Sequence, residues 1–377
     1  MKFRIERDVL ADAVGWVARG LPARPPVPVL AGILLVADAE GSLTLSAFDY
    51  EVSARITVPA DVDEHGEVLV GGRLLADISR NLPARPIDVE TSGNKVEVVC
   101  GSSHFSLLQM PVDEYPTLPT SPEGSGQIDG AVFTQAVSQV AVAADRGDTL
   151  PILTGVRVEI DGEKMTLLAT DRYRLAMREI TWNPSAPDAS HVALIPARTL
   201  SETAKSLGAA GAVDLSLGAA VGGGGLVGFE AGSRRTTTRL LDGDYPKVAS
   251  IFPTSTDTEA VVQTEELVEA VKRVALVAER NTPVRLRFTD EQLAIEAGSG
   301  DEAQASEAVT ASLTGPELEI AFNPTFLLDG LHAVGTSYTR FSFTEPSRPA
   351  VLTGQIEASG EHDPSYRYVL MPVRFAS

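Results

Sequence analysis

Ala13-Val14-Gly15-Trp16-Val17-Ala18 is a stretch whose pattern, Ala-Val-x-x-Val-Ala, recurs twice along the chain and decides the fold. The second occurrence is Ala136-Val137-Ser138-Gln139-Val140-Ala141, and the third is Ala270-Val271-Lys272-Arg273-Val274-Ala275. The three copies begin 123 and 134 residues apart in a chain of 377 residues. Solenoid repeats are shorter than this, so the spacing predicts three copies of one domain.

Further landmarks repeat in the same order, which makes a chance match untenable. They are Pro28 to Gly32 with Pro151 to Gly155, Ala47 to Tyr50 with Ala169 to Arg172, Glu114 to Pro116 with Asp244 to Pro246, and Met110 to Val112 with Met371 to Val373. The stretches 120–126 and 253–258 have the composition of linkers. We therefore expect domains at residues 1–122, 123–256 and 257–377.

Each copy has the pattern of an α+β domain with two helices and about eight short strands. Apolar spacing predicts opening helices near 7–19, 130–144 and 264–279, and second helices near 73–81, 198–207 and 325–334. In the second copy Val132 belongs to the apolar stripe of the opening helix, and Gln139 lies on its opposite face. In the third copy Thr264 is a predicted N-cap.

The composition limits the class of protein. The formal net charge is −20 and the pI is about 4.7, a balance that by itself disfavours nucleic-acid binding. A single cysteine, Cys100, is typical of a reducing compartment. No apolar run approaches the length of a membrane span, and residues 1–8 lack a signal-peptide core. These features predict a cytoplasmic protein.

No motif in the chain indicates a catalytic function. There is no phosphate loop, dinucleotide fingerprint, His-Glu-x-x-His or Cys-x-x-Cys, and five His residues are scattered singly. We therefore predict no catalytic residue, no metal and no cofactor. Asp49 and Asp171 recur between copies, and we interpret both as turn residues because repeated polar residues in a duplicated fold usually form turns.

The whole chain resembles the bacterial DNA sliding clamps, the beta subunits of the replicative DNA polymerase III holoenzyme. The resemblance is carried by Thr170-Asp171-Arg172-Tyr173-Arg174-Leu175, by Ala321-Phe322-Asn323-Pro324 and by the closing residues 368–374. It implies three tandem clamp domains, each with two helices and two small antiparallel sheets. Two such chains would close head to tail into a ring with pseudo-six-fold symmetry.

The resemblance also implies a function. A clamp is a non-enzymatic processivity factor that encircles double-stranded DNA without reading its sequence. It tethers the polymerase catalytic subunit, the clamp loader, and repair and translesion polymerases through short linear peptides. These peptides would bind in a pocket between domains two and three, and no membrane is involved.

Carried over residue by residue, the resemblance assigns a peptide site. Its expected members are Leu153, Thr170, Arg172, Tyr173, Arg174, Leu175, Pro246, Ser250, Ile251, Asn323, Phe326, Met371, Pro372, Val373 and Arg374. Arg174 and Arg374 are expected to hold peptide carbonyls or carboxylates. Ser250 stands where many relatives have Arg, and Arg172-Tyr173 replace a common Gly-His, so the peptide preference is left open.

Two other surfaces follow from the resemblance. The expected DNA-facing cations are Arg24, Arg73, Arg80, Arg198, Lys205 and Arg273. The expected dimer interface comprises His104, Phe105, Leu107, Leu276, Val277, Asp301, Glu302 and Glu307. Because Ser102 and His104 stand where relatives often have Arg, we expect an interface that depends less on ion pairs.

Three other hypotheses remain open from the sequence. The chain could be a duplicated clamp paralogue that confers tolerance of a clamp-directed inhibitor. It could also be an enzyme on a triplicated scaffold, although no cluster of titratable residues is confined to one copy. Finally, it could be a peptide-docking scaffold that does not encircle DNA.

Overall fold

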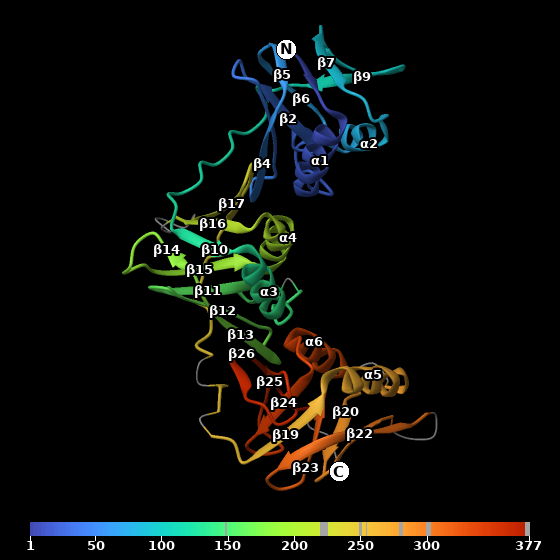
Figure 1. The fold of residues 1–377 in the computed structure, drawn as a ribbon, viewed down its shortest axis with the longest axis vertical. Helices are drawn as coiled ribbons and strands as arrows, with labels where there is room; N and C mark the ends of the chain where they lie inside the picture. Colours follow the sequence, from blue (N-terminus) through green and yellow to red (C-terminus); the bar gives the residue numbers. More distant parts are fainter. Residues whose placement is uncertain are drawn as a thin grey trace. The chain divides into compact units, whose positions relative to one another are not determined.

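The computed structural model describes residues 1–147, 149–218, 225–248, 251–253, 255–278, 282–298 and 303–373 (Figure 1). Four residues of the predicted sites lie outside the described residues, namely Ser250, Asp301, Glu302 and Arg374.

The order of helices and strands repeats three times, which confirms the repeat and the α+β class. The first third contains β1 (Lys2–Ile5), α1 (Arg7–Val17), β2 (Gly32–Ala37), β3 (Ser42–Phe48), β4 (Val52–Pro59), β5 (Asp61–Glu64), β6 (Gly66–Gly71), α2 (Gly72–Asn81), β7 (Ile87–Ser92), β8 (Lys95–Cys100) and β9 (Ser103–Met110). The middle third contains β10 (Gly126–Asp129), α3 (Gly130–Ala141), β11 (Gly155–Asp161), β12 (Lys164–Thr170), β13 (Arg174–Thr181), β14 (Asn183–Pro184), β15 (Ser190–Pro196), α4 (Ala197–Leu207), β16 (Ala212–Leu217), β17 (Leu226–Ala231) and β18 (Arg234–Arg239).

The last third follows the same order, with one strand fewer between its two helices among the described residues. It contains β19 (Thr258–Gln263), α5 (Thr264–Val274), β20 (Val284–Phe288), β21 (Gln292–Ala297), β22 (Ala305–Thr314), β23 (Leu318–Phe322), α6 (Pro324–Val334), β24 (Tyr338–Phe343), β25 (Ala350–Gln355) and β26 (His362–Leu370). Short 3-10 turns, such as η3 (Pro151–Thr154) and η6 (Ala275–Val277), follow helices or precede strands.

The strands of neighbouring copies pair with each other, so the small sheets join into two large antiparallel ones. β18 at the end of the middle third pairs with β4, and β26 at the end of the last third pairs with β13. The results are a 14-stranded sheet and a 12-stranded sheet.

Two compact units follow the two sheets and divide the middle third between them. The first unit comprises Met1–Ala131, Asn183–Ala186 and Glu202–Leu240. The second comprises Val132–Trp182, Pro187–Ser201 and the described part of Leu241–Ser377.

The helices form where the apolar spacing predicts them, with three local corrections. Val132 at the start of α3 is 39% exposed, because the helix has only begun there. Gln139 was predicted to lie on the polar face, but it is buried and its Nε2 donates to the Ala333 carbonyl of α6 at 3.0 Å. Thr264 does not cap α5. Its hydroxyl instead shares a hydrogen bond with the Thr339 hydroxyl at 2.9 Å.

The turn role predicted for Asp49 and Asp171 is confirmed. Asp49 Oδ1 accepts from the backbone N–H groups of Glu51 and Val52 at 3.0 and 2.7 Å. Asp171 Oδ1 accepts from those of Tyr173 and Arg174, both at 3.0 Å. The residue after each Asp has a positive φ, 75° at Tyr50 and 79° at Arg172, and no other described non-glycine residue does. The side-chain bonds therefore hold a left-handed conformation that costs roughly 1–2 kcal/mol for an L-residue.

The described residues contain neither a membrane-spanning helix nor a cluster of side chains that could bind a metal ion. No helix that the structure describes is long and apolar enough to cross a membrane. Among the described residues, no group of three or more His, Cys, Asp or Glu side chains could hold a metal ion.

Candidate functional site

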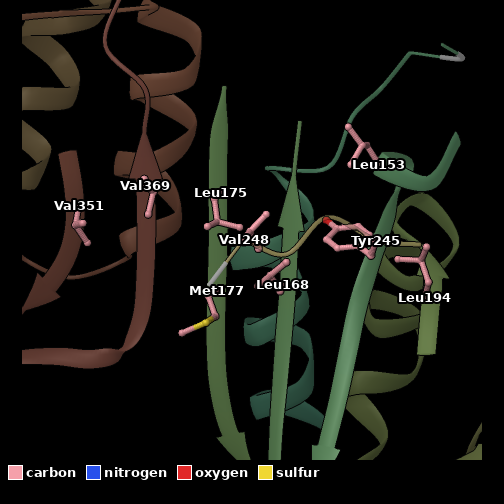
Figure 2. Close-up of a cluster of buried hydrophobic side chains, with 9 residues drawn as sticks. All are labelled: Leu153, Leu168, Leu175, Met177, Leu194, Tyr245, Val248, Val351 and Val369. Atoms are coloured by element: carbon pink, nitrogen blue, oxygen red, sulfur yellow. The ribbon is translucent and has the colours of Figure 1, made fainter. Parts of the chain in front are cut away.

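An apolar cluster lies where β13 pairs with β26 in the second unit. The cross-strand register places Leu175 opposite Val369 and Arg174 opposite Leu370. The buried members of this cluster, which we call the apolar cluster, are Leu153, Leu168, Leu175, Met177, Leu194, Tyr245, Val248, Val351 and Val369 (Figure 2). Figure 2 shows side chains from the middle third on one side and Val351 and Val369 from the last third on the other. The cluster therefore joins two copies of the repeat.

Partly exposed apolar residues border the apolar cluster. Leu150, Ile152, Leu241, Ile251 and Phe252 pack against it, and Met371, Pro372 and Val373 are also only partly buried. Two predicted peptide-site residues, Leu153 and Leu175, lie inside the cluster, and Ile251 lies at its border. Pro246 is exposed beside buried Tyr245. The sequence prediction missed the other seven buried residues of the apolar cluster. For Leu168, Met177 and Leu194, the alternation of inward and outward side chains along a strand is the signal that could have identified them.

The turn between β12 and β13 forms one edge of this region. The Thr170 hydroxyl donates to the Arg174 carbonyl at 2.6 Å and accepts from the Arg172 N–H at 3.1 Å. With the two bonds to Asp171, these contacts direct Arg172 and Tyr173 outward, and both side chains are exposed. The turn is therefore a rigid support for two exposed side chains.

Buried Tyr245 forms a hydrogen bond with the start of this turn. Its hydroxyl accepts from the Thr170 N–H at 3.0 Å. Burial raises the pKa of Tyr245 to about 12, because the phenolate would lose its hydration. The hydroxyl is thus a neutral hydrogen-bonding group at physiological pH.

Tyr173 and Phe326 form an aromatic wall at the border of the cluster. The two rings are stacked with centroids 6.3 Å apart, and Tyr173 remains 58% exposed. The Met371 N–H donates to the Tyr173 carbonyl at 3.0 Å, and the Val373 N–H donates to the Ala321 carbonyl at 2.8 Å. The segment after β26 is therefore hydrogen-bonded to both copies.

Asn323 positions the other half of the wall. Its Oδ1 accepts from the N–H groups of Thr325 and Phe326 at 2.9 and 3.3 Å, which caps α6. Pro324 stands at the first helical position, where its missing N–H has no cost. The Phe326 carbonyl accepts from the Tyr368 hydroxyl at 2.8 Å. Phe326 is therefore held in the first turn of a well-capped helix.

Arg174 has a different environment from the one expected of a peptide ligand. The residue is only 4% exposed, and its Nε and Nη1 donate to Asp171 at 2.9 Å and Asp329 at 2.6 Å. Although burial opposes its charge, Tyr368, Asp329 and Asp171 hold the pKa of Arg174 above its ordinary value. Two carboxylates within the chain therefore already balance the guanidinium.

The predicted DNA-facing cations lie on helices or loops with exposed side chains. Arg73 and Arg80 are on α2, Arg198 and Lys205 on α4, and Arg24 in a proline-rich loop. Arg73 donates to the Pro22 carbonyl at 3.2 Å, so it also packs against that loop.

Arg273 forms an ion pair with Glu307, which is a residue of the predicted dimer interface. Its Nε and Nη2 donate to the two carboxylate oxygens of Glu307, both at 2.7 Å. The Arg273 guanidinium lowers the pKa of Glu307 below its ordinary value. The structure thus pairs a predicted DNA contact with a predicted interface residue.

Two strands have unpaired edges near the predicted interface residues. Within the described residues, only Gln109 and Met110 of β9 pair with β6, so Ser103 to Leu108 pair on one side only. β22 pairs with β21 over Ala305–Thr310 and with β19 over Ala311–Thr314, so each half also has one open side among the described residues.

The apolar residues expected at the interface differ in exposure. Leu276 is 84% exposed on η6, and Phe105 is partly exposed on β9. Leu107, in contrast, is 5% exposed and faces its own core, whereas neighbouring Leu108 points outward. The period-2 alternation of a strand therefore makes Leu108 a further exposed apolar residue on this edge. His104 Nε2 lies 3.2 Å from Glu97 Oε2.

Comparisons with known proteins define the class. Models of the N-terminal, central and C-terminal domains of the DNA polymerase III beta subunit match residues 1–119, 127–247 and 249–374. The beta sliding clamp of Streptomyces coelicolor is 58% identical over 376 residues, with 100% of each chain covered. The beta sliding clamp homolog GriR of Streptomyces muensis is 48% identical, again with 100% of each chain covered.

Solved structures agree with this class. The sliding clamp of Bacillus subtilis superposes with a TM-score of 0.92 at 29% identity, and each chain is covered completely. The Pseudomonas aeruginosa clamp bound to griselimycin gives a TM-score of 0.90 at 28% identity with the same coverage. The chain belongs to the DNA polymerase III beta subunit family, the beta sliding clamps, which are non-catalytic processivity factors of DNA replication.

Proposed function

We propose that the apolar cluster at the β13–β26 junction is the site at which this clamp binds linear peptides of polymerases, the clamp loader and repair proteins. The observation that carries the proposal is a buried apolar floor, including Leu175 and Val369, bordered by the partly exposed segment Met371–Val373 and by exposed Tyr173. Apolar side chains of a peptide would extend this cluster, and each buried CH₂ is worth roughly 0.8 kcal/mol.

Removal of the floor or of the border tests this proposal. Leu175→Ala and a chain that ends at Leu370 should each lose binding of a fluorescently labelled polymerase peptide in an anisotropy titration. The truncated chain lacks the hydrogen bonds from Met371 and Val373. Sedimentation should report the same dimer for both variants. Undiminished peptide binding by both would refute the site.

The ring itself is proposed to close through the two open strand edges. β9 of one protomer would pair with β22 of its partner, which makes the contact heterologous and closed by a two-fold rotation. Pairing these edges removes backbone groups that would otherwise attract other chains. Exposed Phe105 on β9 and exposed Leu276 on η6, which follows α5, support the proposal as apolar residues available for such a contact.

The cations Arg24, Arg73, Arg80, Arg198 and Lys205 are proposed to face duplex DNA inside the ring. Mobile contacts to phosphates give sequence-independent, salt-sensitive attraction, which suits a protein that slides. Arg273 is the weakest member of this group because Glu307 pairs with it. We also propose a cytoplasmic location, as expected for a protein of bacterial replication.

Topological linkage is the decisive test of the ring. The protein should be loaded onto nicked circular DNA with a clamp loader, and the DNA should then be cut once. Retention on circles and loss from linear DNA support encirclement. Equal retention on both forms rejects it and favours a docking scaffold.

A duplicated paralogue is the second function to test, because a relative named as a beta sliding clamp homolog, GriR, is 48% identical to this chain. The higher identity to the Streptomyces coelicolor clamp, 58%, favours the main replicative role. Griselimycin, which is bound in the Pseudomonas aeruginosa structure, is a suitable probe. The main role predicts that depletion of this protein stops replication and that griselimycin binds. A tolerance paralogue predicts dispensability and weak binding.

A further inference from the structure

Arg174 joins three elements around the proposed peptide site. Its Nε bonds to Asp171 in the β12–β13 turn, and its Nη1 bonds to Asp329 on α6. The same Nη1 lies 3.5 Å from the hydroxyl of Tyr368 on β26. A single buried side chain thus connects the turn of one copy to a helix and a strand of the next.

The guanidinium of Arg174 also supports the aromatic wall. Its central carbon lies 4.4 Å from the centroid of the Phe326 ring, and that ring stacks on Tyr173. Phe326 and Asp329 are three residues apart on α6, so their side chains are neighbours on one helix face. Arg174 therefore contacts the ring and the carboxylate of the same face together.

We infer that Arg174 and Asp329 are positioning residues, which hold Phe326 and Tyr173 as one wall of the peptide site without binding the peptide themselves. The inference rests on the proposed function of that site. It adds Asp329, which the sequence comparison did not assign, and it changes the role expected of Arg174 from ligand to support.

The charge balance argues against a direct peptide contact. Arg174 carries one positive charge, and Asp171 and Asp329 supply two negative charges within 3 Å of its nitrogens. A peptide carboxylate would have to displace one of these partners in a buried location, where unpaired charges are costly. Nearby Arg146 is much more exposed, and its Nη2 lies 3.9 Å from Asp329 Oδ2. This longer ion pair can partly balance the charge of Asp329, but it does not replace the contact with Arg174.

The test uses Asp329→Asn in the full-length protein, because the two possible roles of Arg174 predict opposite changes in the affinity for an acidic peptide. The probes are a labelled polymerase peptide and a version in which Asp and Glu are replaced by Asn and Gln. If Arg174 positions the wall, Asp329→Asn weakens both peptides equally, by about ten-fold or more, equivalent to about 1.4 kcal/mol. If Arg174 binds a peptide carboxylate, the same change removes a competitor and strengthens the acidic peptide only. That second result overturns the inference.

Coupling between the two residues sharpens the test. Arg174→Ala should weaken both peptides as Asp329→Asn does, and the double variant should be no worse than Arg174→Ala alone, because both act through one contact. Additive losses contradict the inference. Should Asp329→Asn fail to fold, Phe326→Leu removes the ring between Arg174 and Tyr173 and should produce the same loss for both peptides.

Asp363→Asn is the matched control. Asp363 on β26 pairs with Arg178 of β13 at 2.7 Å, so it also links the two copies, but it touches neither Phe326 nor Tyr173 in the described contacts. Peptide affinity should change by less than about two-fold, as expected for a partly exposed pair. A ten-fold loss in this control would mean that any ion pair between the copies suffices, which contradicts a specific role for Arg174.

Hydrogen exchange separates this inference from the proposed function. In Asp329→Asn, the N–H of Met371, which bonds to the Tyr173 carbonyl, should exchange faster than in the wild type and in Asp363→Asn. Faster exchange supports the positioning role even if the wild-type protein binds neither peptide, a result that would reject only the peptide site. Unchanged exchange with unchanged affinity overturns the inference.

Discussion

The strand pair β4 and β18 in the first unit and the strand pair β13 and β26 in the second occupy equivalent places in the repeat, but their chemistry differs. Ser53 faces Thr237 in the first pair, whereas Leu175 faces Val369 in the second. Next along the strands, Arg55 faces Arg235, whereas Met177 faces Arg367. The turns beside them are alike, because Asp49 and Asp171 make the same two backbone bonds.

This difference explains why the proposed peptide site is placed at only one of the two junctions. The first junction holds a small cavity of about 150 Å³ lined by Ser53, Arg55, Leu118, Pro119, Thr120, Ser121, Arg235 and Thr237. Two arginines and several hydroxyls would have to lose water to receive an apolar peptide, and this loss of hydration opposes binding. The backbone therefore forms equivalent junctions in the two units, and the side chains at each junction determine which kind of ligand it can bind.

The largest expected effect comes from truncating the apolar junction. Leu175 is fully buried, so Leu175→Ala should reduce the free energy of unfolding by about 2–5 kcal/mol through lost transfer energy and a cavity. The equivalent change in the polar junction, Ser53→Ala, leaves the buried Thr237 hydroxyl without its partner and should cost about 1–3 kcal/mol. Urea unfolding of both variants measures the pair, and equal costs would remove the proposed distinction between the junctions.

Alkaline pH should weaken both junctions alike. Burial raises the pKa of Tyr115 and of Tyr245 to about 12, whereas an unfolded tyrosine ionises near pH 10. Because the folded state binds these protons more tightly, the stabilisation is complete below about pH 10 and is lost as the pH rises to about 12. Each tyrosine contributes about 3 kcal/mol to this fall, since one pKa unit corresponds to about 1.4 kcal/mol.

Unfolding free energies measured between pH 8 and pH 12 test this point. Tyr245→Phe and Tyr115→Phe should each make the decline shallower. A decline as steep as in the wild type in both variants would assign the alkaline sensitivity to other groups, such as buried Tyr366 and Tyr368.

A moderate effect should come from unbalancing the polar junction. The hydroxyls of Ser53 and Thr237 are buried and 2.6 Å apart. Thr237→Val strands the Ser53 hydroxyl and should cost about 1–3 kcal/mol, whereas adding Ser53→Ala should recover part of that loss. Thermal unfolding of the single and double variants measures the recovery. A double variant less stable than Thr237→Val would show that the bond is not the relevant contact.

The smallest effect concerns the feature that the junctions share. Arg172 has a φ of 79°, so Arg172→Gly relieves a left-handed conformation but adds freedom to the unfolded chain. The net expectation is a stabilisation of about 0.5 kcal/mol. Tyr50→Gly is the counterpart, but it also removes the edge contact with Phe48 at 5.8 Å and should gain less. A loss of stability in Arg172→Gly would mean that the side chain has contacts worth more than the strain.

Much of the fold could be predicted because it depends on local patterns. Apolar spacing located both helices of every copy, and repeated landmarks such as Asp49 and Asp171 identified equivalent turns. These signals act within a few residues of one another. The prediction for Thr264 was wrong because its hydroxyl bonds to Thr339, which is 75 residues away.

The candidate site was predictable only in part. Leu153 and Leu175 could be assigned from resemblance, and the structure brings both into one buried cluster with Val351 and Val369. Gln139 and Arg174 are polar and were expected to be accessible. Both are buried, because their partners Ala333 and Asp329 come from the last third of the chain.

The sequence by itself determined that the chain contains three copies of an α+β domain of one family, since periodicity and repeated motifs are properties of residue order. Only the tertiary structure decided that the copies share two continuous sheets and that one junction is apolar and the other polar. It also decided that Arg174 is paired inside the protein. The physical reason is that burial and pairing depend on residues brought together across the chain, such as Leu175 with Val369 and Ser53 with Thr237.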